Sequence, residues 1–165
     1  MSGGLAVVRL RAAGDGEQAP DSSSTWDDWG ERDGPPPPGL GRLLVEADGE
    51  VVGDVSWHSV WYGPNEGSRS LNIGISLVPA VRGRGIGTLA QRALAEHLFA
   101  TTDVQRVEAS TDLANVAEQR SLEKAGFTRI GILRSAQARA DGLHDLVAYE
   151  LLRSDVADLS ADLSE

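Results

Sequence analysis

The fold is decided by the stretch Leu77-Val78-Pro79-Ala80-Val81-Arg82-Gly83-Arg84-Gly85-Ile86-Gly87-Thr88. Residues 70–78 are predicted to form a strand, and from Ile86 onward apolar residues recur with the period of a helix. A strand that passes through glycines into a helix presents backbone N–H groups at the positive end of the helix dipole, and such a site binds phosphate. Glycine suits this loop because a β-carbon would hold a diphosphate away from the amides. Arg82 and Arg84 can add charge-assisted hydrogen bonds.

Upstream of this stretch, the pattern predicts an antiparallel meander. A first strand is expected at residues 5–11, and residues 43–47 and 51–57 form a hairpin around the turn dipeptide Asp48-Gly49. Between the first strand and the hairpin, residues 12–40 are rich in Gly, Ser and Asp. They end in four consecutive prolines, followed by Gly39, and a polyproline run cannot form a helix or a central strand.

Downstream, the pattern predicts a strand at residues 104–111 and a helix at 115–125 closed by Gly126. Strands at residues 127–133 and 146–152 follow. An antiparallel meander that leads into one strand–helix–strand crossover implies a single α/β domain with a mixed, mostly antiparallel sheet flanked by helices.

Composition narrows the class of protein. A chain of 165 residues with 41% apolar residues suits one domain, placed here at residues 1–153, and residues 154–165 are interpreted as an acidic C-terminal tail. The N-terminus has no secretion signal and no run is long enough to span a membrane, so a soluble cytoplasmic protein is expected. A net charge of −10 argues against nucleic acid as a partner and could attract a cationic acceptor. There is no cysteine and no metal-ligand constellation.

The glycine-rich loop is also compared with two other phosphate-binding patterns and with a helix start that binds no ligand. A Walker P-loop needs a lysine that the loop lacks. Residues 85–90 do satisfy the permissive dinucleotide pattern Gly-x-Gly-x-x-Ala, but they follow an antiparallel meander, and no acidic residue ends a strand about 20 positions later. A ligand-free helix start would leave the two arginines unexplained. Phosphate binding is favoured, and both rivals stay open.

The motifs together resemble the GNAT superfamily of N-acetyltransferases. Arg82 to Gly87 fits that family's Arg/Gln-x-x-Gly-x-Gly/Ala loop without a gap. Residues 115–127 look like its second cofactor helix, and residues 141–152 are similar to the closing strand of the RimJ/RimL-like branch that acetylates ribosomal-protein N-termini. The resemblance runs from about residue 43 to 153, and residues 12–40 form a divergent acceptor-side segment.

The resemblance implies acetyl-coenzyme A (acetyl-CoA) as cofactor, bound in a splayed strand pair. Pantetheine would pair with Ser76, Leu77 and Val78, and the loop from Arg82 to Thr88 would hold the pyrophosphate. Asn115 would reach the pantetheine arm, although Asn115 and Glu118 also form a plausible helix-capping pair. The implied activity is direct acetyl transfer to a primary amine, on a protein N-terminus or a small molecule. A non-catalytic module that binds coenzyme A (CoA) is the alternative, and a homodimer is left open.

Catalytic residues are harder to assign from the resemblance. Where many relatives have a tyrosine on the second helix, this chain has Leu122, and where the branch often has serine and glutamate it has Glu118 and Gln137. Glu118 could act through water, or serve as a helix cap or solvated charge. The candidates for the acceptor pocket are aromatic or basic and lie on the hairpin or in the divergent segment: Trp26, Trp29, Trp57 and His58. Packing roles are equally compatible with the tryptophans.

Overall fold

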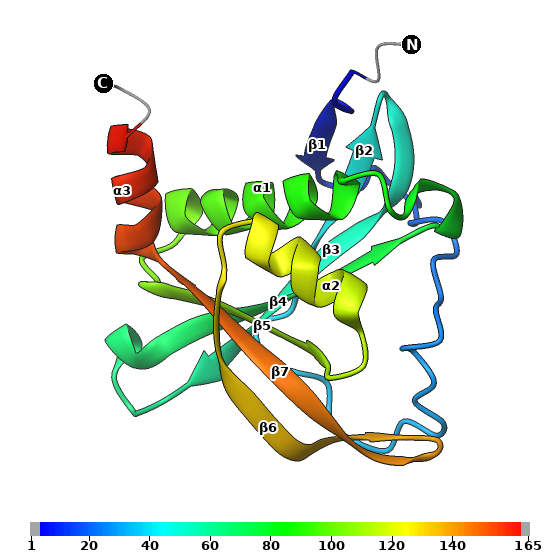
Figure 1. Ribbon diagram of the computed structural model, residues 1–165, viewed down its shortest axis with the longest axis vertical. Coiled ribbons are helices and arrows are strands. Elements are labelled where there is room, and N and C mark those ends of the chain that lie inside the picture. The colour runs from blue at the N-terminus through cyan, green and yellow to red at the C-terminus, as the bar shows by residue number, and fades with distance from the viewer. Residues whose placement is uncertain (1–3, 163–165) are drawn as a thin grey trace.

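The computed structural model describes residues 4–162, which form one seven-stranded sheet covered by helices (Figure 1). The strands are β1 (Val8–Arg11), β2 (Gly41–Ala47), β3 (Glu50–Trp61), β4 (Arg69–Leu77), β5 (Arg106–Asp112), β6 (Thr128–Arg139) and β7 (Gly142–Leu152). Their order across the sheet is β1-β2-β3-β4-β5-β7-β6, and only the β4–β5 pair is parallel. The predicted mixed, mostly antiparallel α/β fold is confirmed.

The helices pack where the periodicity places their apolar side chains. In α1 (Ile86–Thr101), Ile86, Ala90, Leu94 and Leu98 are almost fully buried at spacings of four residues. The second helix, α2 (Val116–Lys124), buries Leu122 in the same core. Both helices lie on one side of the sheet (Figure 1). Short 3-10 turns, η1 (Glu66–Ser68) and η2 (Pro79–Val81), precede β4 and the glycine loop.

The two inner parallel strands separate soon after they meet. β4 and β5 pair only at Leu71 with Val107 and at Asn72 with Glu108. Within residues 4–162, the stretch of β4 from Ile73 to Leu77 therefore has a strand neighbour only on its β3 side. The predicted splayed strand pair is present, and it leaves one edge of β4 without strand partners.

Local turn chemistry agrees with the sequence at two places. Asp48 and Gly49 both have positive φ, 52° and 86°, as a tight two-residue hairpin turn requires. Gly126 has a φ of 101° just after α2, the left-handed conformation expected of a helix-ending glycine.

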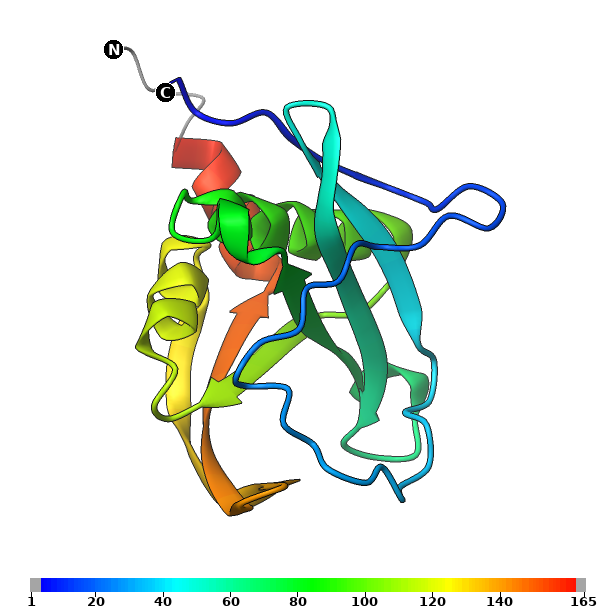
Figure 2. The ribbon, with the colours of Figure 1, turned by 90° about the vertical axis from the view of Figure 1, so that its right-hand side faces the viewer.

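Residues 12–40 contain no helix or strand and run as an extended coil past the sheet (Figure 2). At the other end of the chain, α3 (Arg153–Asp162) occupies most of the segment interpreted as an acidic tail. The Asp155 carboxylate accepts a hydrogen bond from the Leu152 N–H at 3.0 Å, and Val156 packs against the core. The first turn of α3 is thus attached to the domain. Within residues 4–162, no helix combines the length and apolarity needed to cross a membrane.

Candidate functional site

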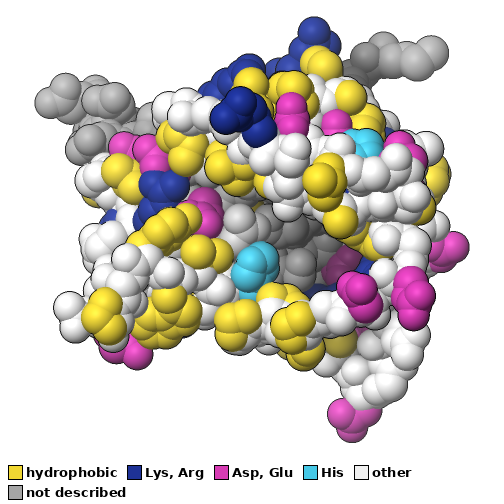
Figure 3. All heavy atoms as spheres, turned by 90° about the horizontal axis from the view of Figure 1, so that it is seen from below, with side chains coloured by type: hydrophobic (Ala, Val, Ile, Leu, Met, Phe, Trp, Pro, Cys, Tyr) yellow, Lys and Arg dark blue, Asp and Glu magenta, His cyan; other side chains and the backbone are white. Residues whose placement is uncertain are grey.

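A cleft of about 1420 Å³ opens where β4 and β5 separate. Its walls are the 13–29 segment, parts of β2 to β4, the loop before α1, and the near sides of α1, α2, β5 and β6. The space-filling view from below also shows a hollowed surface with acidic side chains beside it (Figure 3). The splay and the start of α1 thus meet in one concave site.

The glycine loop ends in an unpaired N-terminus of α1. Gly85 is the N-cap residue with a φ of 79°, and Gly83 has a φ of 73°. A β-carbon at either position would meet no protein atom within 4 Å, so glycine is favoured here by its left-handed backbone and not by crowding. Among residues 4–162, the N–H groups from Gly83 to Thr88 have no acceptor. This row of free donors at a helix start suits an anionic ligand.

The predicted loop residues divide into those that line the cleft and those that do not. Gly83, Gly85, Gly87 and Thr88 line it. Ile86 is in the core at 1% exposure, so only its backbone can serve a ligand. Arg84 is exposed beside the loop and makes no ion pair with the described residues.

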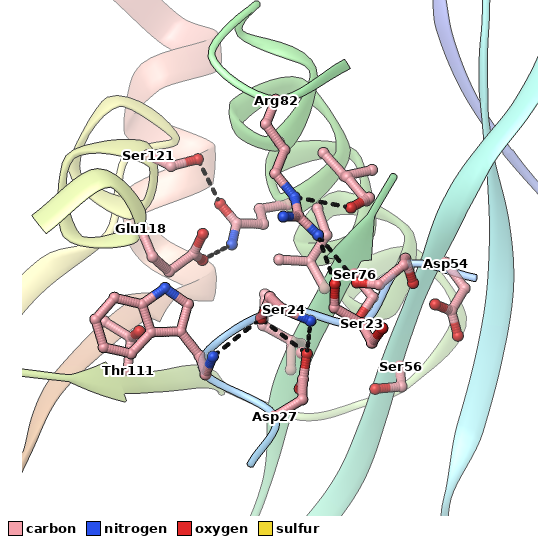
Figure 4. A pocket seen from close by; sticks show the side chains of 18 of the residues that line it. Ser23, Ser24, Asp27, Asp54, Ser56, Ser76, Arg82, Thr111, Glu118 and Ser121 are labelled. Carbon is pink, nitrogen blue, oxygen red and sulfur yellow. Dashed lines mark hydrogen bonds between the residues drawn. The ribbon is translucent and has the colours of Figure 1, made fainter. Parts of the chain in front are cut away.

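Arg82 lines the cleft but is already engaged. Its Nε donates to the Leu77 carbonyl at 3.0 Å, and its Nη2 donates to the carbonyls of Ser22 and Ser23 at 3.0 and 3.3 Å (Figure 4). This side chain therefore ties the 13–29 segment to the end of β4.

The strand residues expected beside pantetheine are only partly in the cleft. Ser76 and Leu77 line it. Val78 does not, and its N–H donates to the Val52 carbonyl at 2.8 Å, across the strand pair on the other side.

The start of α2 brings Asn115 and Glu118 to the cleft in different roles. Asn115 Oδ1 accepts from the Glu118 N–H at 3.3 Å, which is the predicted cap. The Glu118 carboxylate does not cap the helix in return. It turns toward α1 and accepts a hydrogen bond from Gln91 Nε2 (Figure 4). Burial raises the pKa of Glu118 to about 7, and the bond from Gln91 opposes that rise.

The far wall of the cleft is built around a buried ion pair. Arg139 donates through Nη2 to Asp112 Oδ2 at 2.5 Å, and its guanidinium lies 5.6 Å from the centre of the Trp26 ring. Asp112 also contacts His144, whose Nδ1 lies 2.8 Å from its carboxylate. Gln137 lines the cleft from β6, so both candidate catalytic positions, Glu118 and Gln137, reach the same space.

The four acceptor-pocket candidates do not share one environment. Trp26 and Trp29 line the cleft. Trp57 does not, because strand alternation places it with Val55 on the α1 side of β3, 6.3 Å from the His97 ring. His58 shares the Ser56 face of β3 but lies beyond the residues that line the cleft. The hairpin instead contributes Asp54 and Ser56 (Figure 4).

Several cleft residues were not anticipated from the sequence, namely Gln91, Ser121, Arg120 and Lys124. No sequence signal marked Gln91, because it lies outside the apolar face predicted for this helix, and its burial depends on how α2 packs against α1. Arg120 and Lys124 are exposed cations that form no ion pair within the described part of the chain.

This fold, with a splayed strand pair beside a free helix N-terminus, defines a class of CoA-binding acyltransferases, and the comparison with known families agrees. Residues 8–128 match the Acetyltransferase (GNAT) domain, and the chain belongs to that family. GNAT acetyltransferases use acetyl-CoA, and members have been solved with CoA bound.

Individual relatives can be named. The chain is 32% identical over 112 residues to the putative ribosomal N-acetyltransferase YdaF of Bacillus subtilis, covering 64% of this chain and 56% of that protein. RimJ of Mycobacterium smegmatis, in complex with CoA-disulfide, has a similar fold, with a TM-score of 0.64, 24% identity and coverage of 71% of this chain and 55% of that one. The aminoglycoside acetyltransferase AAC(6')-Ib with CoA gives a TM-score of 0.59 at 26% identity, covering 72% and 69%. The chain spans about half the length of the curated relatives it matches.

Proposed function

We propose that this chain is an acetyl-CoA-dependent N-acetyltransferase that acts on a primary amine. The observation that carries the proposal is the junction of two backbone rows: the edge of β4 that no strand pairs with from Ile73 to Leu77, and the N–H groups from Gly83 to Thr88 that have no acceptor among the described residues. A thiol-bearing arm next to a diphosphate matches these two rows in order.

The residues present fit CoA. Ser76 and Leu77 would face the pantetheine amides, and the loop N–H groups would hold the pyrophosphate. In a chain with a net charge of −10, the cations Arg84, Arg120 and Lys124 remain available for phosphate charge near the loop and α2. Asn115 lines the cleft and keeps its amide N–H₂ for the arm, because its Oδ1 is used by the cap.

Glu118 is the residue we assign to proton transfer. When bound, acetyl-CoA supplies a thioester whose carbonyl carbon is attacked by the amine nitrogen, so that a C–N bond forms as the C–S bond breaks and CoA leaves. The amine must lose a proton, and a carboxylate whose pKa is about 7 is half ionised at neutral pH and can accept it. Leu122 is buried in the core at 1% exposure and offers no acid to the leaving sulfur. A thiolate can depart without one.

The acceptor is proposed to be a protein N-terminus or a small-molecule amine. Similarity to a putative ribosomal N-acetyltransferase supports the first, and similarity to an aminoglycoside acetyltransferase supports the second. The Asp27 carboxylate lines the cleft and favours a cationic acceptor in both cases, whereas the Asp54 carboxylate beside it is paired with Arg42.

Thermal unfolding with CoA and with NAD, followed by turnover of acetyl-CoA with a panel of amines, tests the proposal. The panel contains Ser- and Ala-initiated peptides, an aminoglycoside and a diamine. CoA should raise the melting temperature and NAD should not, because a ligand stabilises the folded state by mass action only if it binds that state. Equal shifts with NAD, or none with CoA, would overturn the cofactor assignment. A CoA shift without turnover of any amine would favour the non-catalytic CoA-binding module.

A further inference from the structure

Gln91 is a buried amide in the middle of a core helix. It is 2% exposed and follows Ala90, which is fully buried, on the inner side of α1. An amide in such a place destabilises the fold unless its donors and acceptor are satisfied, so its partners explain why it is tolerated.

Those partners form a chain of hydrogen bonds between α1 and α2. Gln91 Nε2 donates to Glu118 Oε1, and Gln91 Oε1 accepts from Ser121 Oγ at 3.0 Å (Figure 4). Ser121 Oγ in turn lies 3.3 Å from Thr88 Oγ1, in the first turn of α1. This series of hydrogen bonds therefore runs from the first turn of α1 to the Glu118 carboxylate in the cleft.

We propose that Gln91 is a positioning residue for Glu118, and that its amide, with Ser121 behind it, keeps the Glu118 carboxyl hydrogen-bonded both before and after that carboxyl takes up a proton. The inference rests on the proposed function, in which Glu118 accepts the proton of the amine.

The chemistry of an amide explains the choice of glutamine. When Glu118 is ionised, the Gln91 N–H₂ donates to it and the Gln91 carbonyl accepts from Ser121, as the structure has it. When Glu118 is protonated, a half-turn of the amide lets the carbonyl accept the carboxyl O–H. The N–H₂ then donates to Ser121 Oγ, whose own proton can go to Thr88. An apolar residue could make neither set of bonds, and a second carboxylate would repel the first.

The ionisation of the Glu118 carboxyl depends on its burial and on the hydrogen bond from Gln91. The pKa of Glu118 is displaced upward by burial and held down by Gln91. The other charged groups that line the cleft are Glu17, Asp21 and Asp27 in the 13–29 segment, Arg42 on β2, Asp54 on β3, Arg82 before α1, Asp112 on β5, Arg120 and Lys124 on α2, and Arg139 on β6, and none of them contributes to the displacement. Removal of the Gln91 amide should therefore raise the pKa of Glu118 further.

Gln91→Met tests the proposal, because methionine keeps the length of the side chain without its hydrogen bonds. The acid limb of the kcat/KM profile should move up by about one pH unit, as expected when an ionised carboxylate loses one donor. Activity would then fall about tenfold below pH 6 and approach the wild-type value above pH 9. Ser121→Ala should move the limb less, since it leaves the Gln91–Glu118 bond in place.

A second readout does not depend on turnover. The Glu118 carboxyl carbon, labelled with ¹³C and assigned by its loss in Glu118→Gln, should titrate near pH 7 in the wild type and about one unit higher in Gln91→Met. An unmoved midpoint in a folded Gln91→Met variant would overturn the role of Gln91. If the midpoint moves but Glu118→Gln keeps full activity, the positioning stands and the proposed catalytic role of Glu118 fails. Should Gln91→Met not fold, a Ser121→Ala midpoint identical to the wild type would count against the inference.

Discussion

Asn115 and Glu118 are joined by a hydrogen bond in one direction only: the Asn115 side chain accepts from the Glu118 N–H at 3.3 Å, and the Glu118 carboxylate points away. The cap is complete without the carboxylate, because the Asn115 N–H is taken by the Asp112 carbonyl at 2.9 Å. The Glu118 backbone is thus held at the start of α2, while its side chain lines the cleft and accepts a hydrogen bond from Gln91. A substitution of the Glu118 side chain can therefore test catalysis without removing the cap of α2.

Glu118→Gln should lower kcat/KM by roughly 10² to 10⁴, the range for loss of a general base. The amide keeps the shape of the side chain and the Asn115 cap, so CoA affinity should stay within about twofold. Steady-state kinetics and calorimetric titration with CoA provide the two numbers. A loss below tenfold would show that the amine is deprotonated by another route.

The same substitution should change how stability depends on pH. The pKa of Glu118 is about 7 in the folded protein against an ordinary value of 4.5, so between these values the folded state holds a proton that the unfolded state releases. Stability therefore falls as pH rises from about 4.5 to about 7, by at most roughly 3 kcal/mol. Glu118→Gln removes this loss, and its melting temperature relative to the wild type should be higher at pH 8 than at pH 4.5. An identical difference at both pH values would contradict the displaced pKa.

Gly87→Glu should abolish CoA binding in a folded protein. Gly87 lies at the start of α1, and a carboxylate there would meet the unpaired N–H groups and repel a diphosphate. Gly67→Glu is the control for charge, because it adds the same carboxylate outside the cleft; a β-carbon there meets nothing within 4 Å, whereas one at Gly87 would lie 3.3 Å from Ser121 Oγ. Calorimetric titration should give no CoA binding for the first variant and wild-type affinity for the second. Wild-type affinity in Gly87→Glu would remove the loop from the proposed site.

Arg139→Gln should destabilise the fold by at most about 3 to 5 kcal/mol, because it removes the guanidinium from the buried Asp112 carboxylate and leaves His144 as its side-chain partner. Arg139 also holds the 13–29 segment through the Trp26 carbonyl at 3.4 Å. Arg42→Gln breaks the ion pair with Asp54, in which the arginine side chain is 63% exposed. This substitution should lower the free energy of unfolding by no more than about 1 kcal/mol. Urea unfolding of both variants measures the contrast. Equal losses would mean that the Arg139 pair is as solvated as the Arg42 pair.

Deletion of residues 154–165 should cost about 1 to 3 kcal/mol and leave CoA affinity unchanged. The loss comes from the contacts of Val156 with the core and of Asp155 with the end of β7. Arg153 should be retained, because its guanidinium donates to the carbonyls of Phe99, Thr102 and Val104 at the end of α1. A truncated protein as stable as the full chain would support the interpretation of this segment as a tail.

Local sequence patterns were enough to predict most helices and strands and the glycine-rich loop before α1. The helical period beginning at Ile86, the Asp48-Gly49 turn and the glycine after α2 each depend on residues within a few positions of one another, and all three occur as predicted. Element ends were less accurate: β3 continues to Trp61 and β6 to Arg139, beyond the predicted ends, because pairing with β4 and β7 sustains them.

Only the tertiary structure decided which side chains share the cleft. Glu118 meets Gln91 from 27 positions away, and Arg139 reaches Trp26 across 113 positions. Trp57 and Trp26 looked equivalent as pocket candidates, yet one packs on α1 and the other lines the cleft. Periodicity specifies the face of an element on which a side chain lies, but the partner on that face depends on how distant elements pack. For the same reason Glu118, a plausible cap in the sequence, is a half-buried acid that lines the cleft in the folded protein.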